Sequence, residues 1–349
     1  MEIAEVEVDG WRRIVRFRDD AAGFEAIIAV HDATLGPGCG GCRMRRYETF
    51  DAALEDVKRL SRGMTYKNAL GGIPFGGGKS VILADPRTEK TPELFRAFGR
   101  AVDHLGGLYV TAEDSGVDER DLMIAREATP HVGGLGLRGR GGNPSPFTAR
   151  GVLRGIEAAA RKRLGATSLD GVRVAILGVG AVGMELARLL HEAGARLTVA
   201  DVDETAVRAA AERFDAAPVS IEDCLVGDVD VARPTALWGA IAPAMIGELK
   251  AAIVAGAANN QLATPEMDAA LRDRGTLYAP DYVINAAGVI SVGLEILGEW
   301  SAEEMSRRID GIGDALTKIF ERAEVEGRPT GEVADEMAQG VIAEARNTA

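Results

Sequence analysis

The fold is decided by the stretch VRVAILGVGAVGMELARLLHE, residues 172–192. The alternating and β-branched residues Val172–Leu177 predict a buried strand, and Met184–Glu192 predicts a helix. Between them stands the pattern G-V-G-A-V-G of residues 178–183. A lone G-x-G-x-x-G is a weak signal, but a strand before it and a helix after it are the context of a dinucleotide-binding α/β fold.

Each glycine of this pattern has a physical role. Gly178 permits a tight turn, Gly180 lets a pyrophosphate approach the backbone, and Gly183 lets helix and strand pack closely. A second predicted strand ends at Asp201, which would accept hydrogen bonds from both ribose hydroxyls and repel a 2′-phosphate. No Arg or Lys lies between residues 197 and 207 to receive such a phosphate. The sequence therefore predicts NAD rather than NADP, with a ligand-free glycine turn as the alternative. The predicted cofactor-binding residues of this motif are Gly178, Gly180, Ala181, Val182, Gly183 and Asp201.

Length and composition indicate a globular chain of about two domains. It has 349 residues, of which 46% are hydrophobic and 27% charged, and roughly 150 residues per domain is a soft guide. The formal charge of −13, from 40 basic and 53 acidic residues, argues against a nucleic acid or an anionic membrane as partner, because either would favour a basic patch. No window approaches about 18 uninterrupted apolar residues, so we expect no membrane span.

The N-terminus and the cysteines indicate the compartment. MEIAEVEVDG is acidic and has no apolar run, so we expect no signal peptide. Three cysteines give no disulfide framework and fit a reducing cytosol. We therefore expect a cytoplasmic protein.

Cys39 and Cys42 form a C-x-x-C. One interpretation is a redox pair or half of a zinc site, and the other is two small residues in a tight glycine turn. There is no second C-x-x-C, and the four histidines are scattered singly. The pattern therefore favours the turn.

A second glycine-rich stretch, GMTYKNALGGIPFGGGKS at residues 63–80, carries Lys67 and Lys79. A phosphate-binding P-loop needs G-x-x-x-x-G-K-[ST], but the residue five before Gly78 is Ile73. Because that loop depends on a fixed length, the spacing excludes it. The other interpretation is a lysine placed where glycines let the backbone approach a small substrate closely.

The clearest composition shift is GGLGLRGRGGNPSP at residues 133–146, which we interpret as a linker. The sequence predicts an α/β fold of two domains separated by a cleft: a substrate-binding and oligomerisation domain over 1–135 plus about 326–349, and a Rossmann domain over 136–325. Further elements are predicted as strands at 26–30, 80–83, 108–111 and 197–200 and helices at 50–62, 92–104 and 148–161, with Thr91 as a cap of the second helix. An apolar helix face is predicted for Met305, Ile309, Ile312, Leu316, Ile319 and Phe320.

Seven segments together resemble the glutamate/leucine/phenylalanine/valine dehydrogenase family, most closely its leucine and phenylalanine branch. Their order and spacing match as a set from about Ala26 to the C-terminal helix. The segments are TLGPGCGGCRM (34–44), LSRGMTYKNALGGIPFGGGKSVI (60–82), VTAEDSGV (110–117), GNPSPFTARGV (142–152), LGVGAVG (177–183), AGAANNQL (255–262) and YAPDYVINAAGVI (278–290).

The resemblance implies oxidative deamination of an L-amino acid to a 2-oxo acid and ammonia with NAD⁺. By motif, Lys67 in MTYK resembles the lysine that binds the substrate carboxylate, and Lys79 in GGGK resembles the catalytic lysine. Asp114 in AED resembles the carboxylate that relays protons and holds ammonia. Gly40 and Gly41 resemble the backbone that orients the attacking water. These residue types suit the chemistry, because adding water to an iminium and releasing an amine both need proton transfers.

The resemblance also implies contacts on the cofactor side and an assembly. Asn259 and Asn260 lie where the family places an asparagine against the substrate or the nicotinamide. Asn285 in INAAG and Thr148 in PFTA resemble cofactor contacts. Because relatives are dimers to octamers, we expect a homo-oligomer of unknown size.

Three places depart from the family pattern. Cys39 replaces a larger apolar residue or alanine at a position that faces the substrate side chain. Trp238 replaces a glycine in the loop beside the nicotinamide, and the pair Ala232-Arg233 replaces an apolar pair before Pro234. The predicted substrate pocket, lined by Cys39, Ala112, Val289 and Val292, has no cation to bind a side-chain carboxylate. It therefore favours phenylalanine-, leucine- or valine-like substrates, with a slight lean toward phenylalanine.

Two alternatives remain at this stage. One is a catalytically silent, NAD-sensing regulator on the same fold, which the departures at 232–238 keep open. The other is a glutamate-type dehydrogenase, which the apolar pocket disfavours.

Overall fold

The computed structural model describes residues 1–136, 143–234 and 241–348, so Trp238 and the centre of the predicted linker lie outside the described residues. The chain forms two compact units, each built around a six-stranded sheet. The two-domain α/β class expected from the sequence is thereby confirmed. Unit 1 contains Met1–Asn143, Val289–Ser301 and Ala338–Ala349, and unit 2 contains Pro144–Gly288 and Ala302–Met337.

Unit 1 is a mixed sheet with the strand order β1-β2-β3-β5-β4-β6. The pairs β1–β2, β2–β3 and β3–β5 are antiparallel, whereas β5, β4 and β6 run parallel to one another. The strands are β1 (Glu2–Glu5), β2 (Arg13–Asp19), β3 (Phe24–Asp32), β4 (Gly38–Met44), β5 (Gly76–Ile82) and β6 (Tyr109–Glu113).

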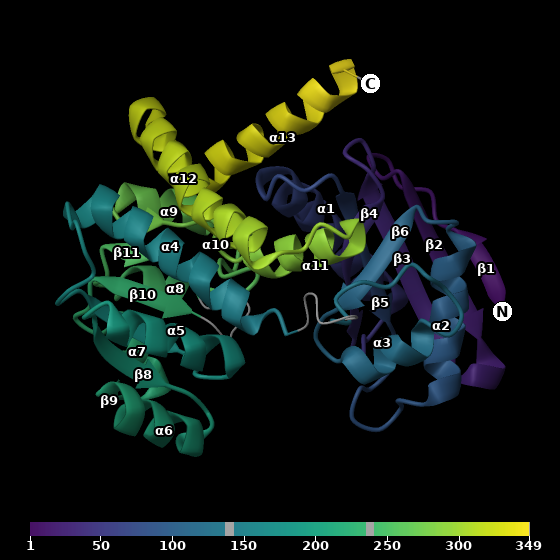
Figure 1. The fold of residues 1–349 in the computed structure, drawn as a ribbon, viewed down its shortest axis with the longest axis horizontal. Helices are drawn as coiled ribbons and strands as arrows, with labels where there is room; N and C mark the ends of the chain where they lie inside the picture. Colours follow the sequence, from purple (N-terminus) through teal and green to yellow (C-terminus); the bar gives the residue numbers. More distant parts are fainter. Residues whose placement is uncertain (137–142, 235–240, 349) are drawn as a thin grey trace. The chain divides into compact units, whose positions relative to one another are not determined.

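Helices cover both faces of this sheet, because alternate residues of β3 pack on opposite sides (Figure 1). Ile27 packs with α1 (Phe50–Leu70), whereas Ile28 belongs to the core under α2 (Pro92–His104) and α3 (Glu119–Ala125). Thr91 caps α2 as predicted: its hydroxyl accepts a hydrogen bond from the backbone N–H of Leu94 at 3.1 Å.

The strand β5 begins at Gly76 and not at Ser80, so the glycine run is part of the sheet. The reason is close packing: a Cβ added to Gly77 would lie 2.0 Å from Thr65 Oγ1 and 2.3 Å from the carbonyl oxygen of Ser61, both in α1. Only glycine lets the helix rest directly on the strand backbone. The contact with α1 therefore overrides the poor strand propensity of glycine.

Unit 2 is an all-parallel sheet in the order β12-β11-β10-β7-β8-β9. When the six strands are renumbered 1 to 6 in chain order and read from the β9 edge, their order is 3-2-1-4-5-6. This is the strand order of a doubly wound nucleotide-binding fold. Its strands are β7 (Arg173–Leu177), β8 (Arg196–Ala200), β9 (Ala217–Pro218), β10 (Val231–Pro234), β11 (Ile253–Val254) and β12 (Leu277–Tyr278).

The predicted helices of unit 2 are present. The apolar face predicted on α12 is buried at all six positions. The helix α4 packs against α12 and α5. The helices are α4 (Ser145–Leu164), α5 (Ala181–Glu192), α6 (Glu204–Phe214), α7 (Ile221–Val226), α8 (Pro243–Ile246), α9 (Glu266–Asp273), α10 (Asp281–Ile284) and α12 (Ala302–Glu326).

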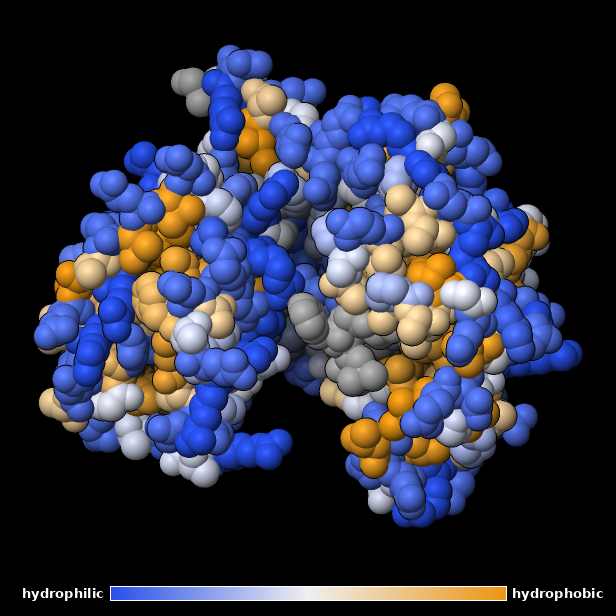
Figure 2. All heavy atoms as spheres, turned by 180° about the vertical axis from the view of Figure 1, so that it is seen from behind, coloured by the Kyte–Doolittle hydropathy of each residue, from blue (hydrophilic) through white to orange (hydrophobic). Residues whose placement is uncertain are grey.

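Two helices, α11 (Ala287–Leu297) and α13 (Thr330–Thr348), contribute residues to both units. The domain ranges expected from the sequence did not include the return of Val289–Ser301 to unit 1, and those ranges remain a prediction. None of the helices in the described ranges is long and apolar enough to cross a bilayer. The face shown in Figure 2 is mostly hydrophilic, with hydrophobic residues in scattered patches.

Candidate active site

The centre of unit 1 holds a buried ion pair between two predicted site residues. Lys79 on β5 and Asp114, directly after β6, lie with Nζ and Oδ2 2.8 Å apart. Their side chains are only 8% and 14% exposed. Burial alone would raise the pKa of Asp114, but the cations of Lys79 and then Arg43 outweigh it and hold the pKa at about 2. The carboxylate is therefore ionised at neutral pH.

The strand β4 lies between β5 and β6, and its two glycines bring the site together. A Cβ on Gly40 would lie 2.1 Å from the carbonyl oxygen of Gly78. A Cβ on Gly41 would lie 2.2 Å from the carbonyl oxygen of Glu113 and 2.9 Å from Asp114 Cβ. Glycine at these two positions therefore lets the neighbouring backbone segments approach β4 closely beside Asp114.

Arg43 is a site residue that the motifs did not single out. Its Nε lies 3.4 Å from Asp114 Oδ2, and its Nη1 lies 3.1 Å from Asp56 Oδ2. Arg43 follows Gly41 by two residues in β4, so both point to the same face of the sheet. Side chains alternate between the two faces of a strand, so the predicted site residue Gly41 could have indicated from the sequence that Arg43 lies on the same face.

Lys67 lies half-buried in the last turn of α1. The next residue, Asn68, is fully buried, and its Nδ2 donates to the carbonyl oxygens of Cys39 at 3.2 Å and Gly76 at 2.6 Å. These bonds tie the end of α1 to β4 and β5, the strands of the ion pair. Asn68 is a second residue that sequence reasoning missed, and it fixes the helix turn that carries Lys67.

The four residues predicted to line the substrate pocket are uncharged and belong to unit 1. A Cβ on Gly134 would come within 3.3 Å of Val292 Cγ2 and 3.9 Å of Ala112 Cβ, so both side chains lie close to the same point beside Gly134. Val289 is one helical turn before Val292 on α11 and is likewise half-buried. Cys39 is fully buried in β4.

The C-x-x-C lies in a strand and not in a turn. Cys39 and Cys42 are three residues apart in β4, so their side chains point to opposite faces of the sheet. Both are free and fully buried, and burial raises the pKa of each thiol to about 12. This geometry favours neither a redox pair nor a shared metal site.

In unit 2 the glycine loop has the geometry that a dinucleotide needs. Gly178 has φ of +102°, and a Cβ on Gly183 would lie 2.0 Å from the carbonyl oxygen of Gly178. Gly180 is the N-cap of α5 and has no side-chain cap, and a Cβ added there would meet nothing within 4 Å. The first turn of α5, with exposed Ala181 and half-buried Val182, therefore has open space in front of its backbone N–H groups.

Asp201 stands at the end of β8 next to this loop. Its Oδ2 accepts the backbone N–H of Val179 at 2.7 Å, and its Oδ1 accepts that of Asp203 at 3.0 Å. The carboxylate thus holds the glycine loop in place, a function that sequence reasoning did not foresee. Each carboxylate oxygen retains a further acceptor position that a ribose hydroxyl can use.

Of the remaining predicted residues of unit 2, Asn285 and Asn259 are in direct contact. Asn285 Nδ2 donates to Asn259 Oδ1 at 2.9 Å and to the carbonyl oxygen of Ala257 at 3.1 Å. Asn260 adopts the left-handed conformation, with φ of +55°. A Cβ on Gly288 would lie 3.0 Å from Thr148 Oγ1, so this hydroxyl stands beside the start of α11.

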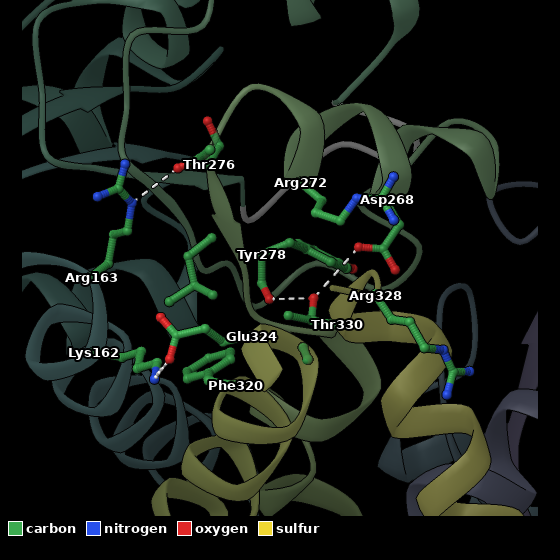
Figure 3. Close-up of a pocket in the computed structure, with 13 residues that line it drawn as sticks. Lys162, Arg163, Asp268, Arg272, Thr276, Tyr278, Phe320, Glu324, Arg328 and Thr330 are labelled. Carbon is green, nitrogen blue, oxygen red and sulfur yellow. Dashed lines mark hydrogen bonds and ion pairs between the residues drawn. The ribbon is translucent and has the colours of Figure 1, made fainter. Parts of the chain in front are cut away.

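A separate pocket of unit 2 opens between α4, α9, β12, α12 and the start of α13 (Figure 3). Lys162 pairs with Glu324 at 2.5 Å on one side of it. On the other side Asp268 accepts the backbone N–H of Gly331 at 2.7 Å, and burial raises the pKa of Asp268 to about 6. None of the predicted site residues lines this pocket.

Comparison with known proteins agrees with this architecture. The model of the family described as "Glu/Leu/Phe/Val dehydrogenase, dimerisation domain" matches residues 12–131, and that of "Glutamate/Leucine/Phenylalanine/Valine dehydrogenase" matches residues 199–348. A leucine dehydrogenase of Bacillus subtilis (strain 168) is 44% identical over 97% of this chain and 93% of its own. A phenylalanine dehydrogenase of Bacillus thermotolerans is 40% identical over 94% of this chain and 87% of its own.

The crystal structure of L-tryptophan dehydrogenase from Nostoc punctiforme superimposes with a TM-score of 0.84 at 40% identity, covering 97% of both chains. A doubly wound domain joined to a second α/β domain, with relatives of this kind over nearly the full length, defines an amino acid dehydrogenase. The chain belongs to the glutamate/leucine/phenylalanine/valine dehydrogenase family.

Proposed function

We propose that this protein catalyses the reversible, NAD-dependent oxidative deamination of an apolar L-amino acid to the 2-oxo acid and ammonia. The observation that carries the proposal is the buried Lys79–Asp114 ion pair, 2.8 Å long, in a chain whose relatives are leucine, phenylalanine and tryptophan dehydrogenases. A catalytically silent regulator would have no need to keep a buried acid–base pair. The pair therefore favours an enzyme over the regulator.

The chemistry divides between the residues of unit 1. Bound NAD⁺ supplies the acceptor for the hydride that leaves Cα of the substrate, which leaves an iminium carbon. Lys79 and Asp114 exchange protons with the water that adds to this carbon and with the amine that departs. The backbone at Gly40 and Gly41 orients the water. Asp114, ionised at neutral pH, holds the released ammonium by charge.

Substrate selection follows from charge and size. Lys67 binds the substrate carboxylate, while the uncharged residues Cys39, Ala112, Val289 and Val292 surround its side chain. No charged group among them pairs with a side-chain carboxylate, which disfavours glutamate. A single methylene changes selectivity by only about 1–3 kcal/mol, so the small Cys39 gives a slight preference for larger substrates such as phenylalanine.

The residues of unit 2 support NAD as the cofactor. The glycines 178, 180 and 183 and the first turn of α5, with Ala181 and Val182, bind the pyrophosphate. Asp201 accepts the ribose hydroxyls and disfavours a 2′-phosphate. Thr148, Asn259, Asn260 and Asn285 bind the nicotinamide end and the substrate. The buried Oδ1 of Asn285 has no hydrogen-bond partner among the described residues and can accept one from the ligand.

Assembly and location complete the proposal. The first family model is that of a dimerisation domain, and a homo-oligomer is proposed on that basis. The three buried free thiols fit the reducing cytoplasm.

A panel of L-amino acids assayed with NAD⁺ and NADP⁺ tests the function, with kcat/KM read from the absorbance of the reduced cofactor. We expect turnover of leucine, phenylalanine or valine with NAD⁺. Strong turnover of glutamate alone would contradict the pocket assignment, and a preference for NADP⁺ would contradict the role of Asp201. Binding of NADH without turnover of any amino acid would favour the silent regulator.

A further inference from the structure

Arg233 is the largest fully buried side chain of the described residues, and it is charged. It is the third residue of β10. Its Nε, Nη1 and Nη2 all lack a hydrogen-bond partner within residues 1–136, 143–234 and 241–348. Burial lowers its pKa to about 9, so the guanidinium is still protonated at neutral pH. An unpaired buried cation is strongly unfavourable unless something compensates it.

The surroundings of Arg233 show where compensation could come from. In the parallel register of β10 and β7, Arg233 is opposite Ile176 and Pro234 is opposite Leu177, the residue before Gly178. Its Nη1 lies 3.7 Å from the position that a Cβ on Gly183 would occupy. The guanidinium thus stands at the carboxyl end of the sheet, against the first turn of α5. This is the point between β7 and β10 where the strand order reverses.

In the part of the chain that the structure describes, no protein anion supplies the missing charge. Burial is the only cause of the lowered pKa of Arg233, so no nearby carboxylate contributes to it. Asp201, at the end of the neighbouring strand β8, is hydrogen-bonded to the backbone of Val179 and Asp203 instead. The glycine-loop end of α5 therefore carries two positive features, the free N–H groups of a helix that lacks a side-chain cap and the guanidinium packed against it.

We propose that Arg233 is a cofactor-binding residue, the buried counter-charge for the pyrophosphate of the dinucleotide. The inference rests on the proposed function, because it needs a dinucleotide at the glycine loop. A cation in a water-excluded site acts more strongly on a nearby anion than one at the surface. The free protein carries the cost of the unpaired charge, and bound pyrophosphate relieves it. This also gives a physical reason for arginine where the resembling family has an apolar residue.

Arg233→Met separates this role from a structural one. Methionine keeps a flexible, unbranched side chain, although a shorter one, and removes the charge, so the free protein should become more heat-stable, because the buried unpaired cation is gone. Binding of ligands with a pyrophosphate should become weaker at the same time. Opposite signs of the two effects are specific to the proposal, since an arginine needed only for packing would lose stability on replacement.

The experiment measures equilibrium binding by calorimetry without any amino acid, using NADH, ADP-ribose and adenosine as probes. For Arg233→Met we expect the Kd values of NADH and ADP-ribose to rise at least roughly tenfold, while the Kd of adenosine, which has no phosphate, stays unchanged. Arg233→Lys, which keeps the charge, should retain most of the affinity. The matched control is Arg196→Met, which removes an exposed arginine at the opposite, amino end of β8 and should bind all three probes like the wild type.

Unchanged affinity of Arg233→Met for ADP-ribose overturns the inference, as does an equal loss for adenosine, which would indicate a distorted site. If Arg233→Met does not fold, Arg233→Gln, which is also neutral, gives the same comparison. The proposed function can fail independently of this inference. A wild type that binds NADH but oxidises no amino acid would contradict the proposed activity without contradicting the role of Arg233 in binding. A wild type that binds no dinucleotide overturns both.

Discussion

Arg43 Nε lies 3.4 Å from Asp114 Oδ2, the same carboxylate oxygen that Lys79 Nζ approaches at 2.8 Å. Arg43 is held in turn by Asp56 at 3.1 Å. Asp114 therefore contacts two cations, and one of them, Arg43, also pairs with a second carboxylate, that of Asp56. We propose that Arg43 acts on the chemistry through Asp114, as a positioning residue.

Arg43→Met should move the pH dependence of the reaction. With one of its two cations gone, the pKa of Asp114 rises from about 2, because burial is then less fully opposed. The acid limb of kcat/KM against pH should shift to higher pH. Arg59→Met is the control, because Arg59 contacts the same Asp56 at 2.7 Å, whereas the cations paired with Asp114 are Arg43 and Lys79. An acid limb that moves equally in both variants would contradict the assignment.

Lys79→Ala should lose most of kcat, by roughly 10²–10⁴-fold if the lysine transfers protons in the reaction. Binding of NADH should persist, because no dinucleotide contact is assigned to Lys79. Steady-state kinetics and calorimetry with NADH measure the two effects. Lys318→Ala, an exposed lysine on α12, is the control with the same change of charge. Near-normal turnover of Lys79→Ala would show that the catalytic residue lies elsewhere.

The sequence was sufficient for features that depend on neighbours along the chain. The Thr91 cap, the apolar face of α12 and the strand–glycine–helix motif are all local patterns, and the structure reproduces them. It was insufficient where pairing between distant segments decides. The glycines of β5 form a strand because α1 packs on them, and Arg43 reaches Asp114 only because β4 lies beside β6. No periodicity within either segment contains that information.

Arg233 shows the same limit from another side. From the sequence alone, Arg233 was an unexplained replacement in the apolar pair that precedes Pro234 in the resembling family. Alternation along β10 puts Ala232 in the core packed with α7 and turns Arg233 to the opposite face. The register with β7 then brings the side chain to the glycine loop. A role for the charge of Arg233 can be inferred only after the order of the strands is known.

Gly77→Ala should destabilise unit 1 and lower activity. The added methyl group would overlap Thr65 Oγ1 and the carbonyl oxygen of Ser61, so α1 must move away from β5, at a cost of about 1–3 kcal/mol. Activity falls because Lys67 lies on α1 and Lys79 on β5. Gly63→Ala in the middle of α1, where nothing lies within 4 Å of the new Cβ, should instead stabilise by about 0.5–1 kcal/mol. Thermal unfolding of both variants tests the contrast, which equal shifts would contradict.

Asp268→Asn should stabilise the protein at neutral pH. Burial raises the pKa of Asp268 from 3.8 to about 6 in the folded protein, so between these values the folded state binds more protons than the unfolded one. The free energy of unfolding therefore falls as pH rises through this window, by about 3 kcal/mol at most. Asparagine is neutral and can still accept the N–H of Gly331 through its side-chain oxygen.

The midpoint of thermal unfolding from pH 4 to pH 8 measures this effect. Asp268→Asn should exceed the wild type at pH 7, and the difference should vanish toward pH 4. Asp273→Asn, an exposed residue in the same helix α9, should track the wild type throughout. A difference between Asp268→Asn and wild type that does not depend on pH would mean that the charge of Asp268 is not the cause.

Alanine substitutions at two glycines of the nucleotide loop should have different effects on NADH binding and on thermal stability. A Cβ on Gly183 would overlap the carbonyl oxygen of Gly178 at 2.0 Å, whereas a Cβ on Gly180 would meet nothing within 4 Å. Gly183→Ala should therefore lower both the melting temperature and the affinity for NADH, because helix and strand are forced apart. Gly180→Ala should leave the melting temperature of the free protein nearly unchanged. It should lower the affinity for NADH, because its methyl group occupies the space proposed for the pyrophosphate. Tight NADH binding by Gly180→Ala would place the pyrophosphate away from this loop.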